Sequence, residues 1–266
     1  MTDKWMETAQ VESCREIAPG IFDLVLRTEN IAEAAKPGQF VSVYSGDSAR
    51  LLPRPISVCG TDGKLLRLVF RTVGKGTAEF SRKRPGESLQ VLGPLGSGYP
   101  LEAADGKQIV LTGGGIGIPP LLYAARRLRE RKDAGDGPLE IRAVLGYRDG
   151  NAFLADEFAK YAKVSIASED GSLGTKGNVI NAMEAEGISP DVFFACGPAP
   201  MLRALKEKAA AEEKECWLSL EERMACGVGA CLSCVCKTTA EDAHSKVNNT
   251  RVCREGPVFA AEDVII

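Results

Sequence analysis

Short apolar or alternating runs, separated by turn-forming pairs, occupy the first hundred residues of this chain. Pro37-Gly38, Asp62-Gly63 and Pro85-Gly86 are such pairs. The runs predicted to be strands are residues 21–27, 39–44, 56–59, 65–71 and 88–92. Short strands at such spacing are typical of a small antiparallel barrel.

Near Ala103 the pattern changes to strands that alternate with helices. The strand-like runs are residues 109–112, 139–145, 164–167 and 192–196, and the helical ones are residues 119–131, 154–161, 178–185 and 199–213. This alternation predicts a parallel sheet covered on both faces. From about Glu215 the chain is loop-rich and cysteine-rich, and it is too short to bury much core alone, so a metal centre would organise it.

Composition narrows the class of protein. Of the 266 residues, 44% are hydrophobic and 26% are charged, and the formal net charge of -3 gives no reason to expect a nucleic-acid or anionic-membrane partner. The chain has no apolar run long enough for a membrane span, and its first ten residues contain no apolar signal core. We therefore expect a cytoplasmic protein, whose nine cysteines are reduced or bound to metal.

Four cysteines near the C-terminus have the spacing C-x4-C-x2-C followed by a single cysteine. They are Cys226, Cys231, Cys234 and Cys253. This spacing is typical of plant-type [2Fe–2S] ligation, and Gly227 and Gly229 would let the loop backbone donate N–H groups to the sulfides. We expect Cys236 to be a spare cysteine outside the ligand set. The alternatives are reduced surface thiols or a structural zinc site, which usually shows two C-x2-C pairs or histidines.

Two motifs of the predicted barrel indicate a flavin site. Arg54-Pro55-Ile56-Ser57 begins a strand, and Gly74-Lys75-Gly76-Thr77 precedes a helix predicted over residues 77–82. Arginine can bind a pyrophosphate through charge and paired donors, and a serine hydroxyl can hydrogen-bond a flavin ring nitrogen. Glycines that open a helix expose N–H groups to a phosphate. Each motif alone is most often only a turn, but together they predict flavin binding.

Two further motifs indicate a dinucleotide site. The glycines Gly113, Gly114, Gly115 and Gly117 follow a strand and open a helix, as a phosphate-binding turn requires. Pro120 stands where the last glycine of G-x-G-x-x-G would be, so the motif is not the usual Rossmann fingerprint. Cys196-Gly197-Pro198 places Cys196 at the carboxyl end of a strand, where ligands of open sheets bind. The alternative reading of Cys196 is a buried cysteine beside a helix cap.

In this order, the motifs R-P-I-S, G-x-G-T, G-G-G-I-G-x-x-P and C-G-P-x-P-M resemble those of the ferredoxin–NADP reductase superfamily over residues 14–213. Residues 222–231 and 253–259 are very similar to the electron-transfer subunits of B-type dihydroorotate dehydrogenases, and that resemblance runs the whole chain. It implies an FAD-binding β-barrel domain (residues 1–102), an NAD-binding α/β domain (103–213) and a [2Fe–2S] cluster domain (214–266).

The resemblance also implies a partner and a set of site residues. A separate FMN-containing catalytic subunit, with two copies of each chain, would oxidise dihydroorotate in pyrimidine biosynthesis and pass electrons through the cluster and FAD to NAD+. The residues implied to touch FAD are Arg54, Pro55, Ile56, Ser57, Val69, Phe70, Arg71, Gly76 and Thr77. Ser57 and Cys196 are implied to be catalytic, with Cys196 near the nicotinamide. Ile56 departs from the superfamily, which usually has a tyrosine there against the flavin ring.

Two other functions remain open. The flavin subunit of a hydrogenase or of an NADH-dependent ferredoxin reductase complex would share this organisation, and the co-purifying partner distinguishes it. A zinc-stabilised binding module would be colourless.

Two further segments bear on the chemistry. Carboxylates of Glu169-Asp170-Gly171 after a strand favour NADH over NADPH, although the nearby Arg148 weakens that argument. The only histidine, His244, lies in a polar run expected to be an exposed loop, so the chain offers no evident base for dihydroorotate oxidation.

Overall fold

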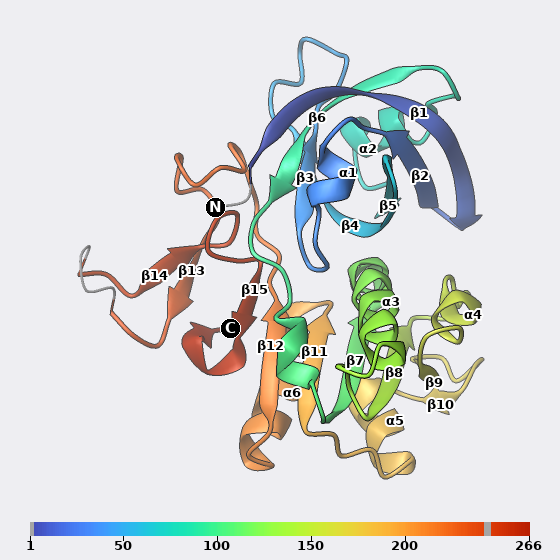
Figure 1. Ribbon diagram of the computed structural model, residues 1–266, viewed down its shortest axis with the longest axis vertical. Coiled ribbons are helices and arrows are strands. Elements are labelled where there is room, and N and C mark those ends of the chain that lie inside the picture. Colours follow the sequence, from blue (N-terminus) through green and yellow to red (C-terminus); the bar gives the residue numbers. More distant parts are fainter. Residues whose placement is uncertain (1–2, 242–245) are drawn as a thin grey trace.

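A computed structural model of the chain describes residues 3–241 and 246–266 (Figure 1). A closed antiparallel barrel forms one half, a mostly parallel sheet flanked by helices forms the other, and a small C-terminal sheet lies beside both. The predicted fold class is therefore confirmed. No helix among the described residues is long and apolar enough to cross a membrane. The loop expected around His244 lies outside the described residues.

The barrel contains six strands and two short helices. They are β1 (Trp5–Ala18), β2 (Ile21–Arg27), α1 (Ile31–Ala34), β3 (Phe40–Val43), β4 (Arg54–Asp62), β5 (Leu65–Arg71), α2 (Lys75–Phe80) and β6 (Ser88–Leu95). The strands close in the order β1-β2-β5-β4-β3-β6, and alternate residues such as Leu24, Leu66 and Leu68 fill the interior. The sequence pattern does not predict β1, because only Ala9 and Val11 of this strand are buried.

The second half is a seven-stranded sheet. In sheet order its strands are β10 (Thr175–Lys176), β9 (Lys163–Ser168), β8 (Glu140–Tyr147), β7 (Gln108–Gly114), β11 (Val192–Cys196), β12 (Glu215–Ser219) and β15 (Val258–Ala260). Only β15 runs antiparallel to its neighbour. The strands β12 and β15 lie beyond residue 213, so the C-terminal segment supplies two strands to the nucleotide-type sheet.

Helices cover both faces of this sheet, as predicted. They are η1 (Leu101–Ala104), η2 (Gly115–Gly117), α3 (Ile118–Asp133), α4 (Ala155–Phe158), α5 (Val179–Ala185) and α6 (Ala199–Ala211). Because side chains alternate along a strand, Ile109 and Leu111 pack with α3 on one face, while Val110 packs with α5 and α6 on the other. The predicted helix over residues 154–161 is shorter in the structure, where only the single turn α4 forms.

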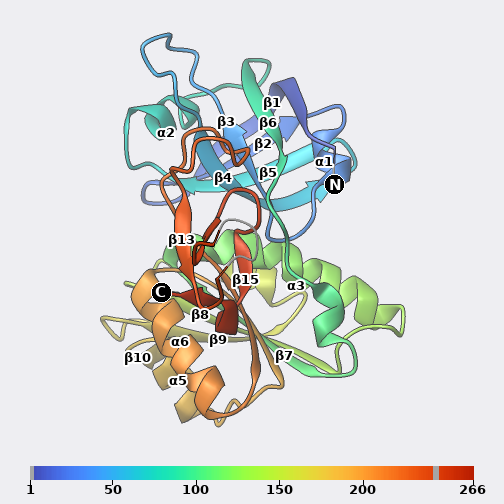
Figure 2. The ribbon, with the colours of Figure 1, turned by 90° about the vertical axis from the view of Figure 1, so that its left-hand side faces the viewer.

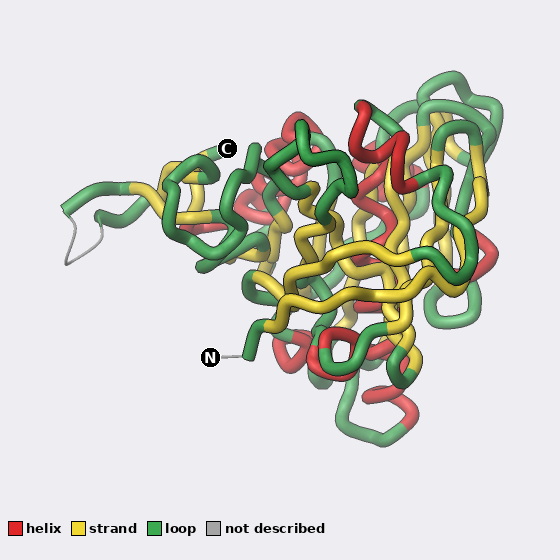
Figure 3. Tube along the Cα trace, turned by 90° about the horizontal axis from the view of Figure 1, so that it is seen from above, coloured by secondary structure: helices red, strands yellow, loops and turns green. Residues whose placement is uncertain are grey.

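The remaining strands make a three-stranded sheet that projects to one side (Figure 3). It contains β13 (Val235–Thr238), β14 (Asn249–Arg251) and β16 (Val264–Ile265), with η3 (Ala261–Asp263) before the last strand. The buried side chains of Cys234, Val252 and Cys253 join one apolar cluster with Phe40 and Leu95 of the barrel. The C-terminal segment therefore shares a core with the barrel rather than building one of its own.

The helix α3 lies between the barrel and the sheet (Figures 1 and 2). Its Tyr123 hydroxyl donates a hydrogen bond of 2.9 Å to the carbonyl of Ala35 in the barrel half. Arg67 of the barrel pairs with Asp23 at 3.0 Å and reaches Glu157 of α4 at 2.6 Å. These contacts fix the orientation of the two halves, and so the distance between the motifs that each of them carries.

Candidate functional site

The loop after Cys226 surrounds its sulfur with backbone donors. The N–H groups of Val228, Ala230 and Cys231 lie 3.4, 3.3 and 3.4 Å from Cys226 Sγ. Gly227 and Gly229 permit this loop because their φ angles are 68° and 85°, in the left-handed region. Burial opposes ionisation of Cys226, but these donors outweigh it and lower the thiol pKa to about 6. The loop therefore favours a thiolate, the form that binds iron.

The four predicted ligands lie as two pairs. Cys226 Sγ accepts the Cys231 N–H at 3.4 Å, and Cys234 Sγ accepts the Cys253 N–H at 3.4 Å. Burial and the neighbouring Cys234 raise the pKa of Cys253 to about 12. Within the described ranges, no group of three or more His, Cys, Asp or Glu side chains lies close enough together to hold one metal ion. Two thiol pairs fit two irons, each held by one pair.

Cys236 belongs to neither pair. It lies on β13, half-buried, and packs against the shared apolar cluster. Burial raises its thiol pKa to about 11. Its position supports the expectation of a spare cysteine.

The two predicted flavin motifs meet in space. A Cβ atom added at Gly76 would lie 2.7 Å from Arg54 Nε, so the absence of a side chain lets the guanidinium lie against the start of α2. The Thr77 hydroxyl accepts the N–H groups of Val73 at 3.0 Å and Gly74 at 3.2 Å, which shapes this turn. The N–H groups of Lys75, Gly76 and Thr77, in the first helical turn, have no partner within the helix, and Gly76 lies against the Arg54 guanidinium. This combination of a cation and free N–H donors fits a pyrophosphate.

Two expected flavin residues, Ile56 and Phe70, pack in the barrel core, and Val69 packs on the other face of β5, in the apolar cluster that contains α3. Ile56, Val69 and Phe70 are buried, and the Phe70 ring packs against Phe22 and Phe80 with centroids 6.0 and 6.2 Å away. Only the backbone of Ile56 and Phe70 can face a cofactor outside the barrel. Ile56 supplies no aromatic face, in keeping with its departure from the superfamily.

The remaining expected flavin residues lie toward the surface. Pro55 and Arg71 are exposed and Ser57 is half-buried. Arg71 Nη2 lies 3.8 Å from where a Cβ of Gly115 would be, which brings the end of β5 to the nucleotide turn. The structure thus places the predicted flavin and nucleotide motifs side by side.

The glycine turn and the Cys196 motif also come together. A Cβ at Gly117 would lie 2.3 Å from the carbonyl oxygen of Cys196, and one at Gly114 would lie 2.7 Å from Met201 Sδ. A Cβ at Gly113 would lie 2.9 Å from Ile118. Because these positions are glycines, β7, α3 and the start of α6 can pack closely together. The turn between β7 and α3 is therefore compact, and it lies at the carboxyl edge of the sheet.

Two residues that no motif indicates lie beside Cys196. Ser219 of β12 is its register neighbour in the sheet, and the Tyr99 hydroxyl donates to the carbonyl of the preceding residue, Ala195, at 2.9 Å. Burial raises the pKa of Cys196 to about 12, so this thiol stays protonated at neutral pH. No sequence signal identifies Ser219, because the pairing of β12 with β11 is a tertiary feature.

The cluster loop touches the flavin strand region. A Cβ at Gly227 would lie 2.8 Å from Ser42 Oγ and 3.3 Å from Leu95, so the loop beside Cys226 packs directly on β3 and β6. Ser42 is the register partner of Pro55 on β4. The predicted cluster loop therefore lies on β3, and the predicted flavin motif lies on the neighbouring strand β4. Figure 2 shows the C-terminal segment against the barrel in this region.

The carboxylates after β9 lie at the same edge of the sheet. The Glu169 and Asp170 N–H groups donate to the carbonyls of Tyr147 at 3.1 Å and Arg148 at 3.3 Å, so this turn continues the pairing with β8. Hydrogen bonds from the Ser172 hydroxyl and N–H lower the pKa of Asp170. The turn therefore carries negative charge next to the carboxyl ends of the parallel strands.

Comparison with known proteins gives consistent similarities. Residues 221–265 match the family model described as the iron–sulfur cluster binding domain of dihydroorotate dehydrogenase B. The chain is 43% identical over 265 residues to a protein of Bacillus caldolyticus named dihydroorotate dehydrogenase B (NAD(+)), electron transfer subunit, with 98% of each chain covered. A protein of that name from Listeria monocytogenes is 40% identical over 253 residues, 94% of each chain.

Solved structures extend the similarity. The NADH-dependent reduced ferredoxin-NADP oxidoreductase structure superposes with a TM-score of 0.84 at 30% identity, covering 97% of this chain and 90% of that chain. A ferredoxin NADP+ reductase from Neisseria gonorrhoeae with bound FAD and NADP has a TM-score of 0.65 at 16% identity, covering 78% and 91%, and shares the fold. Because the 43% identity extends over 98% of both chains, the two proteins correspond along their whole length. This chain therefore belongs to the family of dihydroorotate dehydrogenase B (NAD(+)) electron transfer subunits.

Proposed function

We propose that this chain passes electrons between an FMN-containing dihydroorotate dehydrogenase subunit and NAD+, in pyrimidine biosynthesis, with a [2Fe–2S] cluster and FAD as its own carriers. The observation that carries this proposal is the contact of the Cys226 loop with β3. Gly227 packs on Ser42, which pairs with Pro55 of the flavin motif. Arg71 in turn reaches the nucleotide turn at Gly115. Three sites in a row, in contact, are what stepwise electron transfer requires.

The groups of this chain bind and orient the carriers. When bound, the cluster exchanges single electrons with the flavin, and the flavin exchanges a hydride with the nicotinamide. Arg54 and the first turn of α2 would hold the flavin pyrophosphate, and the Ser57 hydroxyl would hydrogen-bond the flavin ring. The turn from Gly113 to Gly117 would hold the nucleotide phosphates. Cys196, kept protonated by burial and lying beside Ser219, would contact the nicotinamide as a neutral thiol.

The cluster end of the molecule offers a surface for the partner. Val228 and Leu232 are 37% and 61% exposed on the cluster loop, and Cys231 is exposed beside them. Exposed apolar side chains around a redox centre favour a protein interface. We infer that this surface faces the catalytic subunit, that the complex contains two copies of each chain, and that it works in the cytoplasm.

The three-domain assignment is part of this proposal. Residues 1–102 would bind FAD, residues 103–213 would bind NAD, and residues 214–266 would carry the cluster. The strands β12 and β15 make the last two units structurally continuous, because both strands pair into the nucleotide sheet.

The alternative as the flavin subunit of an NADH-dependent ferredoxin reductase complex has weaker support. Its structural relative is 30% identical, against 43% for the dihydroorotate dehydrogenase subunits. Identification of the co-purifying partner separates the two functions. A partner that contains FMN and oxidises dihydroorotate supports the proposal, and a ferredoxin-reducing partner contradicts it.

Anaerobic titration of the purified chain with NADH tests the electron route directly. We expect about one FAD and one [2Fe–2S] cluster per chain, bleaching of the flavin absorption, and an EPR signal from the reduced cluster. Flavin reduction with a cluster that stays oxidised would contradict the route through Ser42. Zinc in place of iron and acid-labile sulfide would contradict the proposal as a whole.

A further inference from the structure

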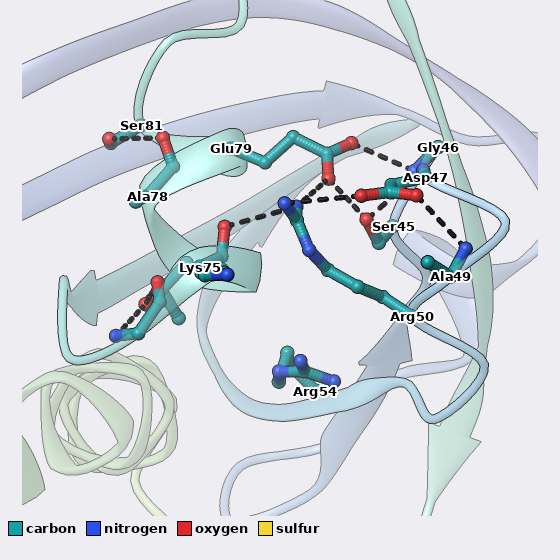
Figure 4. A network of polar contacts seen from close by, with 12 residues as sticks. Ser45, Gly46, Asp47, Ala49, Arg50, Arg54, Lys75, Ala78, Glu79 and Ser81 are labelled. Atoms are coloured by element: carbon teal, nitrogen blue, oxygen red, sulfur yellow. Dashed lines mark hydrogen bonds and ion pairs between the residues drawn. The ribbon is translucent and has the colours of Figure 1, made fainter.

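The loop of residues 45–53 joins β3 to β4 and leads directly into Arg54. Glu79 of α2 holds this loop, as Figure 4 shows. One carboxylate oxygen accepts the Gly46 N–H at 2.8 Å, and the other accepts the Ser45 hydroxyl and the Arg50 guanidinium, the latter at 3.0 Å. Arg50 also donates to the Lys75 carbonyl at 3.4 Å in the first turn of α2. The loop and the start of α2 are therefore fastened to each other.

The two arginines of this region have different surroundings. Arg50 is paired with Glu79 at 3.0 Å and with Asp47 at 3.2 Å, so carboxylates compensate its charge. Within the described part of the chain, Arg54 has no carboxylate partner, and its Nη1 donates to the Leu52 carbonyl at the end of the loop. The loop backbone thus orients Arg54, whose charge is left for a ligand.

Large apolar side chains are exposed in the two segments that lead into Arg54 and into the first turn of α2. Leu51 and Leu52, at the end of the loop, are 82% and 54% exposed, and Val73, just before the first turn of α2, is 80% exposed. The barrel interior elsewhere buries its leucines fully. A ligand that extends beyond the pyrophosphate with a flat aromatic ring would cover such side chains with the face of that ring, and each covered leucine would contribute to binding.

We propose that the loop of residues 45–53 is a further part of the FAD site. Arg50 and Glu79 act as positioning residues for Arg54, and Leu51 and Leu52 cover the adenosine half of the dinucleotide. This inference rests on the proposed function, because it assumes that the Arg54 cradle holds the pyrophosphate of FAD.

Fluorescence titration of the deflavinated chain with FAD and with FMN tests the two parts separately, because FMN keeps a phosphate and lacks the adenosine half. We expect Glu79→Gln to weaken both ligands about tenfold. In an Arg54→Gln background, Glu79→Gln should have little further effect, because it acts through Arg54. The double variant Leu51→Ser and Leu52→Ser should weaken FAD about tenfold and leave FMN unchanged.

Glu12→Gln is the matched control, because it removes an exposed barrel ion pair with Arg27 and should alter neither affinity. Additive effects of Glu79→Gln and Arg54→Gln would overturn the positioning role. The Leu51→Ser and Leu52→Ser double variant could instead bind FAD normally and associate more weakly with the catalytic subunit. That result would assign the two leucines to the partner interface and overturn their part of the proposal. Wild-type chain that binds no FAD would instead contradict the proposed function itself.

Discussion

The thiols of this chain have pKa values set by their immediate neighbours. Backbone N–H groups lower that of Cys226 to about 6, while burial raises those of Cys59 and Cys196 to about 12. The same chemical group therefore favours the thiolate in one place and the neutral thiol in another. Composition alone cannot separate these roles, because the difference lies in which atoms surround each sulfur.

Single serine substitutions should identify the cluster ligands. Replacing any one ligand removes a thiolate from an iron, so we expect each such variant to lose the cluster. The variants are Cys226→Ser, Cys231→Ser, Cys234→Ser and Cys253→Ser. Iron and acid-labile sulfide analysis measures the loss, and Cys236→Ser is the control that should keep full content. Cluster loss in the Cys236 variant, with retention in one of the four, would revise the ligand set.

Cys59, buried on β4, should make stability sensitive to alkaline pH. Burial raises its pKa from 9.0 to about 12, so the folded state favours the neutral thiol. Below pH 9 the contribution of the neutral Cys59 thiol to the free energy of unfolding is fully present. It is lost as pH rises toward 12, because the thiol ionises at lower pH in the unfolded state than in the folded state. Wild type should lose roughly 1.4 kcal/mol more unfolding free energy per pH unit above 9 than Cys59→Ala. Urea unfolding at several pH values measures this, and equal slopes would refute the role of Cys59.

At the scale of elements, the turns after strands carry the residues predicted to bind the nucleotide. The glycine turn follows β7, Cys196 ends β11, and the carboxylates Glu169 and Asp170 follow β9. In a parallel sheet these turns meet at one edge, which is why motifs far apart in the sequence become one site. The helix α3 then holds that edge against the barrel through Tyr123.

The turn after β9 should favour NADH over NADPH. The Asp170 carboxylate, whose pKa is lowered by hydrogen bonds from Ser172, can bind ribose hydroxyls and repel a 2′-phosphate. We expect a higher kcat/KM with NADH in reduction of an artificial acceptor, and a smaller preference in Asp170→Asn. Asp136→Asn, in an exposed loop elsewhere, is the control. A kcat/KM for NADPH at least equal to that for NADH would show this prediction to be wrong.

For the whole molecule, the electron path depends on packing between parts distant in sequence. The C-terminal segment contacts β3 and β6 through Gly227, and a Cβ at Gly96 would lie only 2.5 Å from the Gly256 carbonyl. Both cysteine-bearing loops therefore rest on the barrel. The proposed path leads from the exposed cluster loop to the nucleotide-binding edge of the sheet.

The isolated chain should transfer electrons from NADH to artificial acceptors but should not oxidise dihydroorotate. That oxidation needs a base held near the substrate carbon in a shielded pocket, which the partner would supply. Parallel assays of the chain alone and of the assembled complex measure both activities. Orotate formation by the chain alone, at a rate comparable to the complex, would refute its role as a pure electron-transfer subunit.

The sequence by itself determined the fold class, and it predicted the four cluster cysteines and the flavin and nucleotide motifs, because local spacing, turn residues and periodicity carry that information. It did not predict β1, whose small buried residues alternate weakly, or the pairing of β12 and β15 with the parallel sheet. Only the tertiary structure decided that Gly227 lies on Ser42, that Ser219 lies beside Cys196 and that Glu79 holds the loop before Arg54. These contacts join residues tens to hundreds of positions apart, and strand register and packing set them, so no local pattern could reveal them.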